Sequence, residues 1–170
     1  MVRFLVTPAR KSIIMKTFRI CLLGIVLYFP FLLHATGWVS LNGPSGYFSP
    51  QSVCYHQGAW YISSNTNSST GTGVWKSVSN GFSWTDVSAG LPMPYARDFA
   101  SLGGDLFVAC DTGIYRTSNG GSSWTAADNG LPDYTSVYEM ETHNNSLFAC
   151  VFYGTGNVEI FTLPNGGNTW

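Results

Sequence analysis

Two acidic residues occupy matching positions in this 170-residue chain, and their chemistry could be catalytic. Counted back from the next predicted turn, Asp98 and Glu139 stand at the same place in two predicted strands. A pair of carboxylates can serve as general acid and general base on a glycosidic bond. The alternative is that both carboxylates are simply exposed to water and have no catalytic role, because a solvated acid needs no partner. Both residues therefore stay candidates, and we assign no catalytic residue.

A tyrosine recurs shortly after each Gly-Pro or Leu-Pro pair, at Tyr47, Tyr95 and Tyr134. Arg97 ends one of the same predicted loops. Aromatic side chains in a ring of loops can stack on sugars or clamp a peptide, because each offers a large contact area at low entropic cost. The alternative is a wedge that packs one repeat against the next. These four residues are the ligand-binding candidates.

The cysteines and histidines form no pattern for a metal or a nucleophilic triad. There is no Cys-x-x-Cys motif and no His/Cys cluster at ligand spacing, so we expect no metal and no cofactor. Cys54, Cys110 and Cys150 fall in apolar runs, which favours buried small hydrophobes over an intermolecular bridge or a reactive thiol. His56 and His143 precede matching turns, which predicts surface residues.

The elements that must position these side chains repeat along the chain. Trp38, Trp84, Trp124 and Trp170 are separated by 46, 40 and 46 residues, and a glycine stands three residues before each of the last three. A repeat of about 40–50 residues that consists of predicted strands is typical of a β-propeller or a related repeat array.

The same segments recur in the same order within each period. Two-residue turns at 57–58, 103–104 and 144–145 are rich in Gly and Asn, which accept the positive φ that a tight hairpin needs. The predicted strands are 52–56, 59–63 and 73–77, then 98–102, 105–110 and 113–117, then 137–143, 146–152 and 158–162. A fourth strand begins at each tryptophan. The fold expected is all-β, with three four-stranded antiparallel blades of an incomplete β-propeller.

The segments that end at Trp84, Trp124 and Trp170 resemble the Asp-box, or bacterial neuraminidase repeat, Ser-x-Asp-x-Gly-x-x-Trp. The matching residues are Ser77, Ser79, Gly81, Trp84, Thr117, Asn119, Gly121, Trp124, Asn165, Gly167 and Trp170. The family includes sialidases, sortilin-type receptors and exported propeller proteins of Bacteroidetes. The resemblance covers residues 38–170. It implies a turn in which side chains accept backbone amides and the tryptophan packs the turn against its own blade.

This chain departs from the Asp-box at the acid. Ser79, Asn119 and Asn165 stand at the Asp position, and Leu163 replaces the first Ser. Ser and Asn still accept backbone hydrogen bonds, so we expect the turn to keep its structural role. In the family the box lies on the face away from the ligand, which implies a folding device.

The resemblance leaves three functions open. We favour an exported, non-catalytic propeller that binds a glycan or a protein or acts as a scaffold. The alternative is the N-terminal part of a propeller-type glycoside hydrolase, sialidase-like or xyloglucanase-like. A sialidase needs three arginines around the substrate carboxylate, whereas residues 38–170 contain only Arg97 and Arg116. The third possibility is a purely structural module of a cell-surface protein.

Residues 1–37 predict a helical signal peptide, with Met15 as the expected start. From Met15 the chain has basic residues, an apolar run over 20–33 and small residues up to Gly37. This pattern predicts cleavage before Trp38. The run is shorter than the ~20 residues of a membrane span, and an uncleaved anchor is the alternative. We expect a secreted or cell-surface protein.

Residues 38–170 carry three basic residues against nine acidic ones, a formal charge of −6. Nucleic-acid binding needs clustered Lys and Arg that replace counterions, so we expect no nucleic-acid partner. Propellers close with about four to eight blades, and three blades leave unpaired edges. We therefore expect a fragment, with further blades of the same chain following Trp170.

Overall fold

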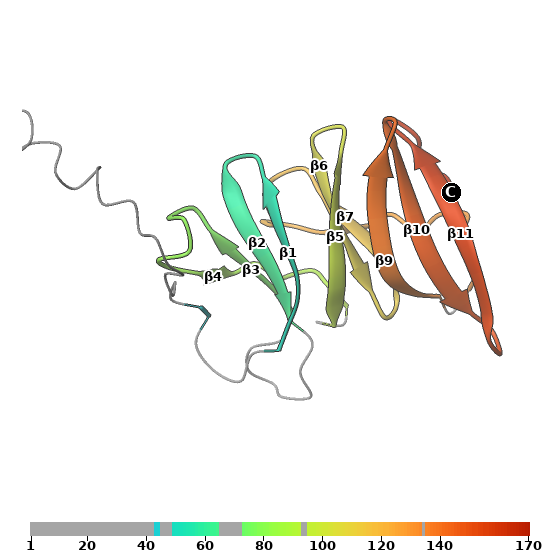
Figure 1. The fold of residues 1–170 in the computed structure, drawn as a ribbon, viewed down its shortest axis with the longest axis horizontal. Helices are drawn as coiled ribbons and strands as arrows, with labels where there is room; N and C mark the ends of the chain where they lie inside the picture. Colours follow the sequence, from blue (N-terminus) through green and yellow to red (C-terminus); the bar gives the residue numbers. More distant parts are fainter. Residues whose placement is uncertain (1–42, 45–48, 65–72, 93–94, 134) are drawn as a thin grey trace, which may run out of the picture. The chain divides into compact units, whose positions relative to one another are not determined.

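The computed structural model describes residues 43–44, 49–64, 73–92, 95–133 and 135–170. These residues form eleven β-strands and no helix, so the described part of the chain is all-β, as predicted. The strands make three antiparallel sheets (Figure 1). The predicted signal peptide, residues 1–37, lies outside the described residues. Within the described ranges, no helix is long and apolar enough to cross a membrane.

Each sheet is built from strands that follow one another in the chain. The first sheet contains β1 (Pro50–His56), β2 (Ala59–Ser64), β3 (Gly73–Ser77) and β4 (Thr85–Asp86). The second contains β5 (Ala96–Leu102), β6 (Asp105–Cys110), β7 (Gly113–Thr117) and β8 (Thr125–Ala126). The third contains β9 (Ser136–His143), β10 (Ser146–Tyr153) and β11 (Asn157–Pro164). Two sheets have the predicted four strands. The third has three, because its expected fourth strand would begin at Trp170, the last residue.

The first two strands of each sheet are joined by the predicted two-residue turns. The φ angles are 44° and 81° at Gln57 and Gly58, 62° and 96° at Gly103 and Gly104, and 47° and 61° at Asn144 and Asn145. Positive φ at both central residues is the mark of a type I′ turn, whose twist matches that of the flanking strands. These turns set the pairing register of the three hairpins.

The second sheet is buried on both faces. Leu106, Val108 and Cys110 of β6 belong to a hydrophobic cluster shared with the first sheet. Phe107 and Ala109 belong to a cluster shared with the third sheet. Side chains alternate between the two faces of a sheet. A strand whose sheet packs between two other sheets therefore needs apolar residues at every position. Full burial of one Val or Leu side chain stabilises by about 1.5–3 kcal/mol, and these two clusters hold the sheets together.

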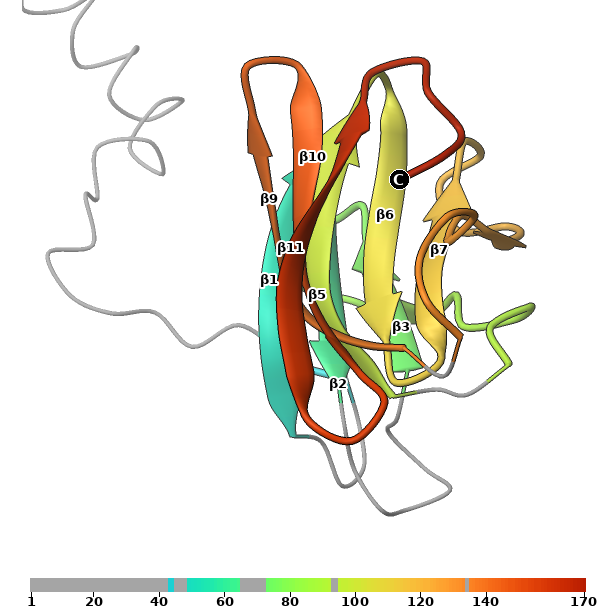
Figure 2. The same cartoon turned by 90° about the vertical axis from the view of Figure 1, so that its right-hand side faces the viewer.

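The first strands of the three sheets lie next to one another. β1 neighbours β5, and β5 neighbours β9, whereas β3 and β7 lie toward the other edge of their sheets (Figure 2). Side chains on β1, β5 and β9 can therefore meet across the sheet boundaries.

The turns that resemble the Asp-box are closed by side chains in the first two repeats. Thr117 Oγ1 accepts the Gly121 amide at 2.9 Å and the Asn119 amide at 3.3 Å. Asn119 Oδ1 accepts the Ser123 amide at 3.0 Å. The matching bonds in the first repeat are made by Ser77 to Gly81 and Ser79, and by Ser79 to Ser83. Asn and Ser thus supply the acceptors in these turns.

The third turn differs because Leu163 has no hydroxyl to accept the Gly167 amide. That amide donates to the Pro164 carbonyl instead, at 2.9 Å. Asn165 Nδ2 donates to Asn145 Oδ1 at 3.0 Å, so this side chain fastens the turn to the β9–β10 hairpin. The Asn165 side chain therefore bonds to a neighbouring hairpin, whereas the Asn119 side chain accepts an amide within its own turn.

Two of the motif tryptophans connect one sheet to the one before it. Trp124 Nε1 donates to the Val87 carbonyl at 2.7 Å, and Trp170 Nε1 donates to the Ala127 carbonyl at 2.6 Å. Val87 and Ala127 each follow the preceding tryptophan by three residues, so each indole reaches into the previous repeat. We expected the tryptophan to pack against its own sheet, whereas Trp124 lies in the cluster that unites the first and second sheets.

Candidate functional site

Each first strand contains a β-bulge near its start, at the end away from its hairpin turn. The extra residue is Arg97 in β5 and Tyr138 in β9, and in β1 the register shift spans Gln51 and Ser52. A bulge bends the strand and re-aims the side chain of the extra residue. Gln51, Arg97 and Tyr138 each stand six residues before a turn, so they occupy matching positions on three adjacent strands. We call these three residues the bulge row.

Arg97 is held in place by contacts with two other elements. Its Cζ lies 4.5 Å from the centroid of the Tyr138 ring, within the range of a cation–π contact. Its Nε donates to Asp111 Oδ1 at 2.5 Å, just after the end of β6. About a quarter of the side chain, 24%, stays exposed. The guanidinium is therefore oriented by the protein and still reachable from solvent.

Tyr138 carries the aromatic surface of the row. Its side chain is 49% exposed, and it meets Phe152 edge to face, with centroids 6.3 Å apart and planes at 89°. Edge-to-face packing is a favoured geometry for aromatic pairs. Tyr95, a predicted ligand contact, is half-buried just before β5. Tyr47 and Tyr134 lie outside the described residues.

Asp98 connects all three sheets. Its Oδ1 accepts the Ser52 hydroxyl of β1 at 2.7 Å, and its Oδ2 accepts the Met140 amide of β9 at 2.7 Å. Both carboxylate oxygens are thus engaged by neighbouring strands. This arrangement makes Asp98 a structural bridge between the first strands.

Glu139 has different surroundings from Asp98. It is exposed and lines a shallow cavity of about 160 Å³ on the outer side of the third sheet, together with Cys150 and Ile160. Asp98 does not line that cavity. This cavity therefore does not bring the two acids together as an acid–base pair.

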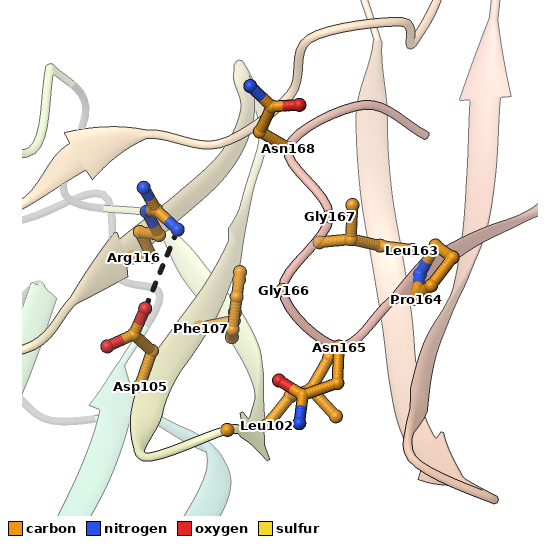
Figure 3. A pocket seen from close by; sticks show the side chains of 11 residues that line it. Leu102, Asp105, Phe107, Arg116, Leu163, Pro164, Asn165, Gly166, Gly167 and Asn168 are labelled. Carbon is orange, nitrogen blue, oxygen red and sulfur yellow. Dashed lines mark ion pairs between the residues drawn. The ribbon is translucent and has the colours of Figure 1, made fainter.

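A larger polar cavity of about 370 Å³ lies between the second sheet and the third motif turn (Figure 3). Arg116 Nη1 faces Asp105 Oδ2 at 3.6 Å on its rim. In the first sheet the matching residue, Lys76, instead donates to the Gly120 carbonyl of the next motif turn at 3.0 Å. Arg116 sits beside the hairpin-turn end of its sheet, whereas Arg97 lies at the other end. Arg97, a predicted ligand contact, therefore does not line the cavity that contains Arg116.

His56 is buried, contrary to the prediction of a surface residue. It is 8% exposed, and its Nδ1 lies 2.8 Å from Ser101 Oγ of the second sheet. Burial disfavours the imidazolium and lowers the pKa of His56. Thr142 Oγ1 donates to the Ser101 carbonyl at 2.9 Å, so Ser101 contacts both neighbouring sheets. His143, at the matching position of β9, is exposed as predicted.

The three cysteines of the described residues are free thiols. Cys110 is fully buried, and burial raises its pKa to about 12. Cys54 is half-buried, and burial likewise raises its pKa. Cys150 is half-buried on the outer side of the third sheet. The prediction of buried small hydrophobes is confirmed for Cys110 and is only partly met by the other two.

No protein-family model matches the chain, and no curated protein is significantly similar to it. Over the ranges that the structure describes, no group of three or more His, Cys, Asp or Glu side chains is placed to hold a metal ion. The chemistry that this site offers is therefore that of the bulge row: a guanidinium, a phenol ring and a carboxamide.

Two members of the bulge row, Gln51 and Tyr138, are absent from the residues predicted as ligand contacts. A signal for them exists in the sequence, because both stand six residues before a predicted turn, as Arg97 does. The sequence does not reveal that every first strand is bulged at that point. Without the bulge, strand alternation alone decides where these side chains point.

Proposed function

We propose that residues 38–170 belong to an exported Asp-box β-propeller that binds carbohydrate along the bulge row and catalyses no reaction. In this proposal the three sheets are blades. The repeated strand order, the neighbouring first strands and the indole bonds from one repeat to the previous one support it. Each is a feature expected of repeats that contact only their nearest neighbours.

The bulge row is the observation that carries the proposal. A pyranose has an apolar face that packs on an aromatic ring, which Tyr138 offers, and hydroxyls that pair with amides and guanidinium groups. Arg97 and Gln51 supply those two groups from the neighbouring sheets. Bulges are over-represented next to functional sites, where they re-aim side chains.

The surroundings of the acids favour binding over hydrolysis. A base or nucleophile needs an oxygen directed at the reacting centre, but both oxygens of Asp98 accept bonds from other strands. Glu139 lines a separate cavity on the third sheet. The bulge row itself contains no carboxylate.

Isothermal titration calorimetry with a panel of neutral and uronic-acid oligosaccharides tests the proposal. Tyr138→Ala should weaken binding by about tenfold or more, which corresponds to about 1.4 kcal/mol of lost stacking. Phe82→Ala is the matched control, because Phe82 is an aromatic residue, 69% exposed, in the first motif turn at the other end of the strands. The control should bind as the unmodified chain does.

Two results would contradict the proposal. The first is a folded chain that binds no oligosaccharide of the panel, or a Tyr138→Ala variant with unchanged affinity. The second is the appearance of shorter products when the panel is incubated with the protein and separated by chromatography. That second result would favour the glycoside hydrolase alternative.

A further inference from the structure

The boundary between the first and second sheets is filled by side chains beside the second motif turn. The Lys76 ammonium donates to the Gly120 carbonyl of that turn at 3.0 Å. A Cβ at Gly120 would lie 2.6 Å from Lys76 Nζ and 3.3 Å from the Tyr61 hydroxyl. Two side chains of the first sheet therefore occupy the space next to this glycine.

The matching space between the second and third sheets is the polar cavity of about 370 Å³ (Figure 3). Gly166 lines it and stands in the third motif turn where Gly120 stands in the second. A Cβ at Gly166 would meet nothing within 4 Å. The two boundaries thus share one design, and the second leaves open the place that an ammonium takes in the first.

Differences at matched positions of the second sheet account for the open space. Phe107 stands where the first sheet has Tyr61, so the hydroxyl is missing. Asp105 stands where the first sheet has an alanine, and Arg116 stands where it has Lys76. Arg116 Nη1 faces Asp105 Oδ2 at 3.6 Å, on the rim of the cavity. The cavity therefore follows from residues of this boundary itself.

The rim carries one group of each charge. The side chains of Arg116 and Asp105 are 44% and 27% exposed, and at 3.6 Å their separation exceeds that of a hydrogen bond. Both groups therefore keep hydrogen-bonding capacity for a ligand. The third motif turn, Asn165–Asn168, forms the facing wall (Figure 3). The volume lies within the range of about 300–1,000 Å³ that is usual for small-molecule sites.

We propose that this cavity binds a small zwitterion with the charges of an α-amino acid. The ligand's ammonium takes the place that the Lys76 ammonium has at the first boundary, and it donates to the Gly166 carbonyl and the Asp105 carboxylate. The ligand's carboxylate pairs with the Arg116 guanidinium, whose planar fork fits a carboxylate. A ligand with a single charge would leave one member of the rim pair unmatched. This site is separate from the bulge row, so the inference does not rest on the proposed function.

Isothermal titration calorimetry with a panel of the common L-amino acids tests the inference on the unmodified chain. At least one amino acid should bind, and its α-amide and its N-acetyl derivative should each bind about tenfold more weakly or less, because each lacks one charge. A folded chain that binds no amino acid of the panel overturns the inference. An amino acid whose two derivatives bind as well as it does also overturns it.

Two single substitutions test the rim pair. Asp105→Asn and Arg116→Gln should each weaken binding of the amino acid by about tenfold or more, since each removes one charged partner. Asp133→Asn is the matched control, because Asp133 is an exposed acid outside the cavity, and it should bind as the unmodified chain does. Unchanged affinity in both rim variants would overturn the inference.

A variant that copies the first boundary gives a test that does not depend on loss of folding. It combines Asp105→Ala, Phe107→Tyr and Arg116→Lys, which are the residues of the first sheet at these positions. We expect it to fold and to bind no amino acid, because its own ammonium and hydroxyl fill the cavity. Retained binding would overturn the inference. Tyr138→Ala should leave the amino-acid affinity unchanged, and a loss there would place the ligand at the bulge row instead.

Discussion

The carboxylate of Asp98 accepts the backbone amide of Met140 across the boundary between the second and third sheets, at 2.7 Å. The other oxygen accepts the hydroxyl of Ser52 from the first sheet, also at 2.7 Å. One side chain thus satisfies a donor in each neighbouring sheet. Hydrogen bonds to a charged acceptor are stronger than neutral ones, so this bridge adds to the apolar clusters that unite the sheets.

Asp98→Asn should lower the free energy of unfolding by about 1–3 kcal/mol, because the amide NH₂ cannot accept and leaves one donor unpaired. Urea denaturation followed by circular dichroism measures the loss. Glu139→Gln is the control at the matching but exposed position, and it should leave stability unchanged. Equal losses for the two variants would contradict the bridging role.

Thr117→Val should destabilise the protein by about 1–2 kcal/mol, because its hydroxyl oxygen accepts the Gly121 and Asn119 amides in the second motif turn. Thermal unfolding by calorimetry tests this expectation. Ser118→Ala alters an exposed neighbour in the same turn and should have no effect. A neutral Thr117→Val would mean that water replaces the hydroxyl without loss.

Gly130→Ala should destabilise more than Gly156→Ala. Both glycines have positive φ, 91° and 124°, but a Cβ at Gly130 would lie 2.8 Å from the Trp170 carbonyl oxygen, whereas a Cβ at Gly156 meets nothing within 4 Å. The difference between the two variants in urea denaturation isolates the steric clash from the backbone strain that they share. Similar losses of stability in the two variants would show that the backbone at Trp170 can shift to accommodate the added Cβ at little cost.

Stability should fall as the pH drops from about 7 toward 5. The pKa of His56 is lowered in the folded state relative to 6.5, because burial disfavours its charged form. Between the two values the unfolded chain binds more protons, so the free energy of unfolding decreases as the pH falls below about 6.5. Urea denaturation at stepped pH measures this slope. His56→Gln should reduce it, and His143→Gln, at the exposed matching position, should not.

The strand order and the hairpins follow from local chemistry, and the sequence predicts them well. The two-residue turns require positive φ, which Gly and Asn accept, and the segments between the turns have the apolar runs of strands. The motif turns are predictable for the same reason, because Thr117 and Asn119 bond within a few residues of themselves.

The long-range contacts could not be predicted from the sequence. His56 was expected at the surface because it stands beside a turn, but burial depends on the second sheet, whose Ser101 contacts its ring. The indole bond of Trp124 to Val87 likewise depends on how two sheets pack. The same holds for the candidate site. Arg97 can be predicted because it ends a predicted loop, whereas Tyr138 is recognised as a site residue only from the bulge in β9.

In the proposed function, the bulges place the residues that a ligand would contact. Gln51, Arg97 and Tyr138 lie where the strand ladder is interrupted, but Arg97 is paired with Asp111 and Tyr138 packs on Phe152. Of the three positions, we therefore expect substitution at Gln51, whose exposed side chain bonds to the adjacent Ser49 and Pro50, to change the folding energy least. In the proposed function each sheet contributes one side chain to the ligand, so a change within one repeat would alter specificity and leave the other two repeats as they are.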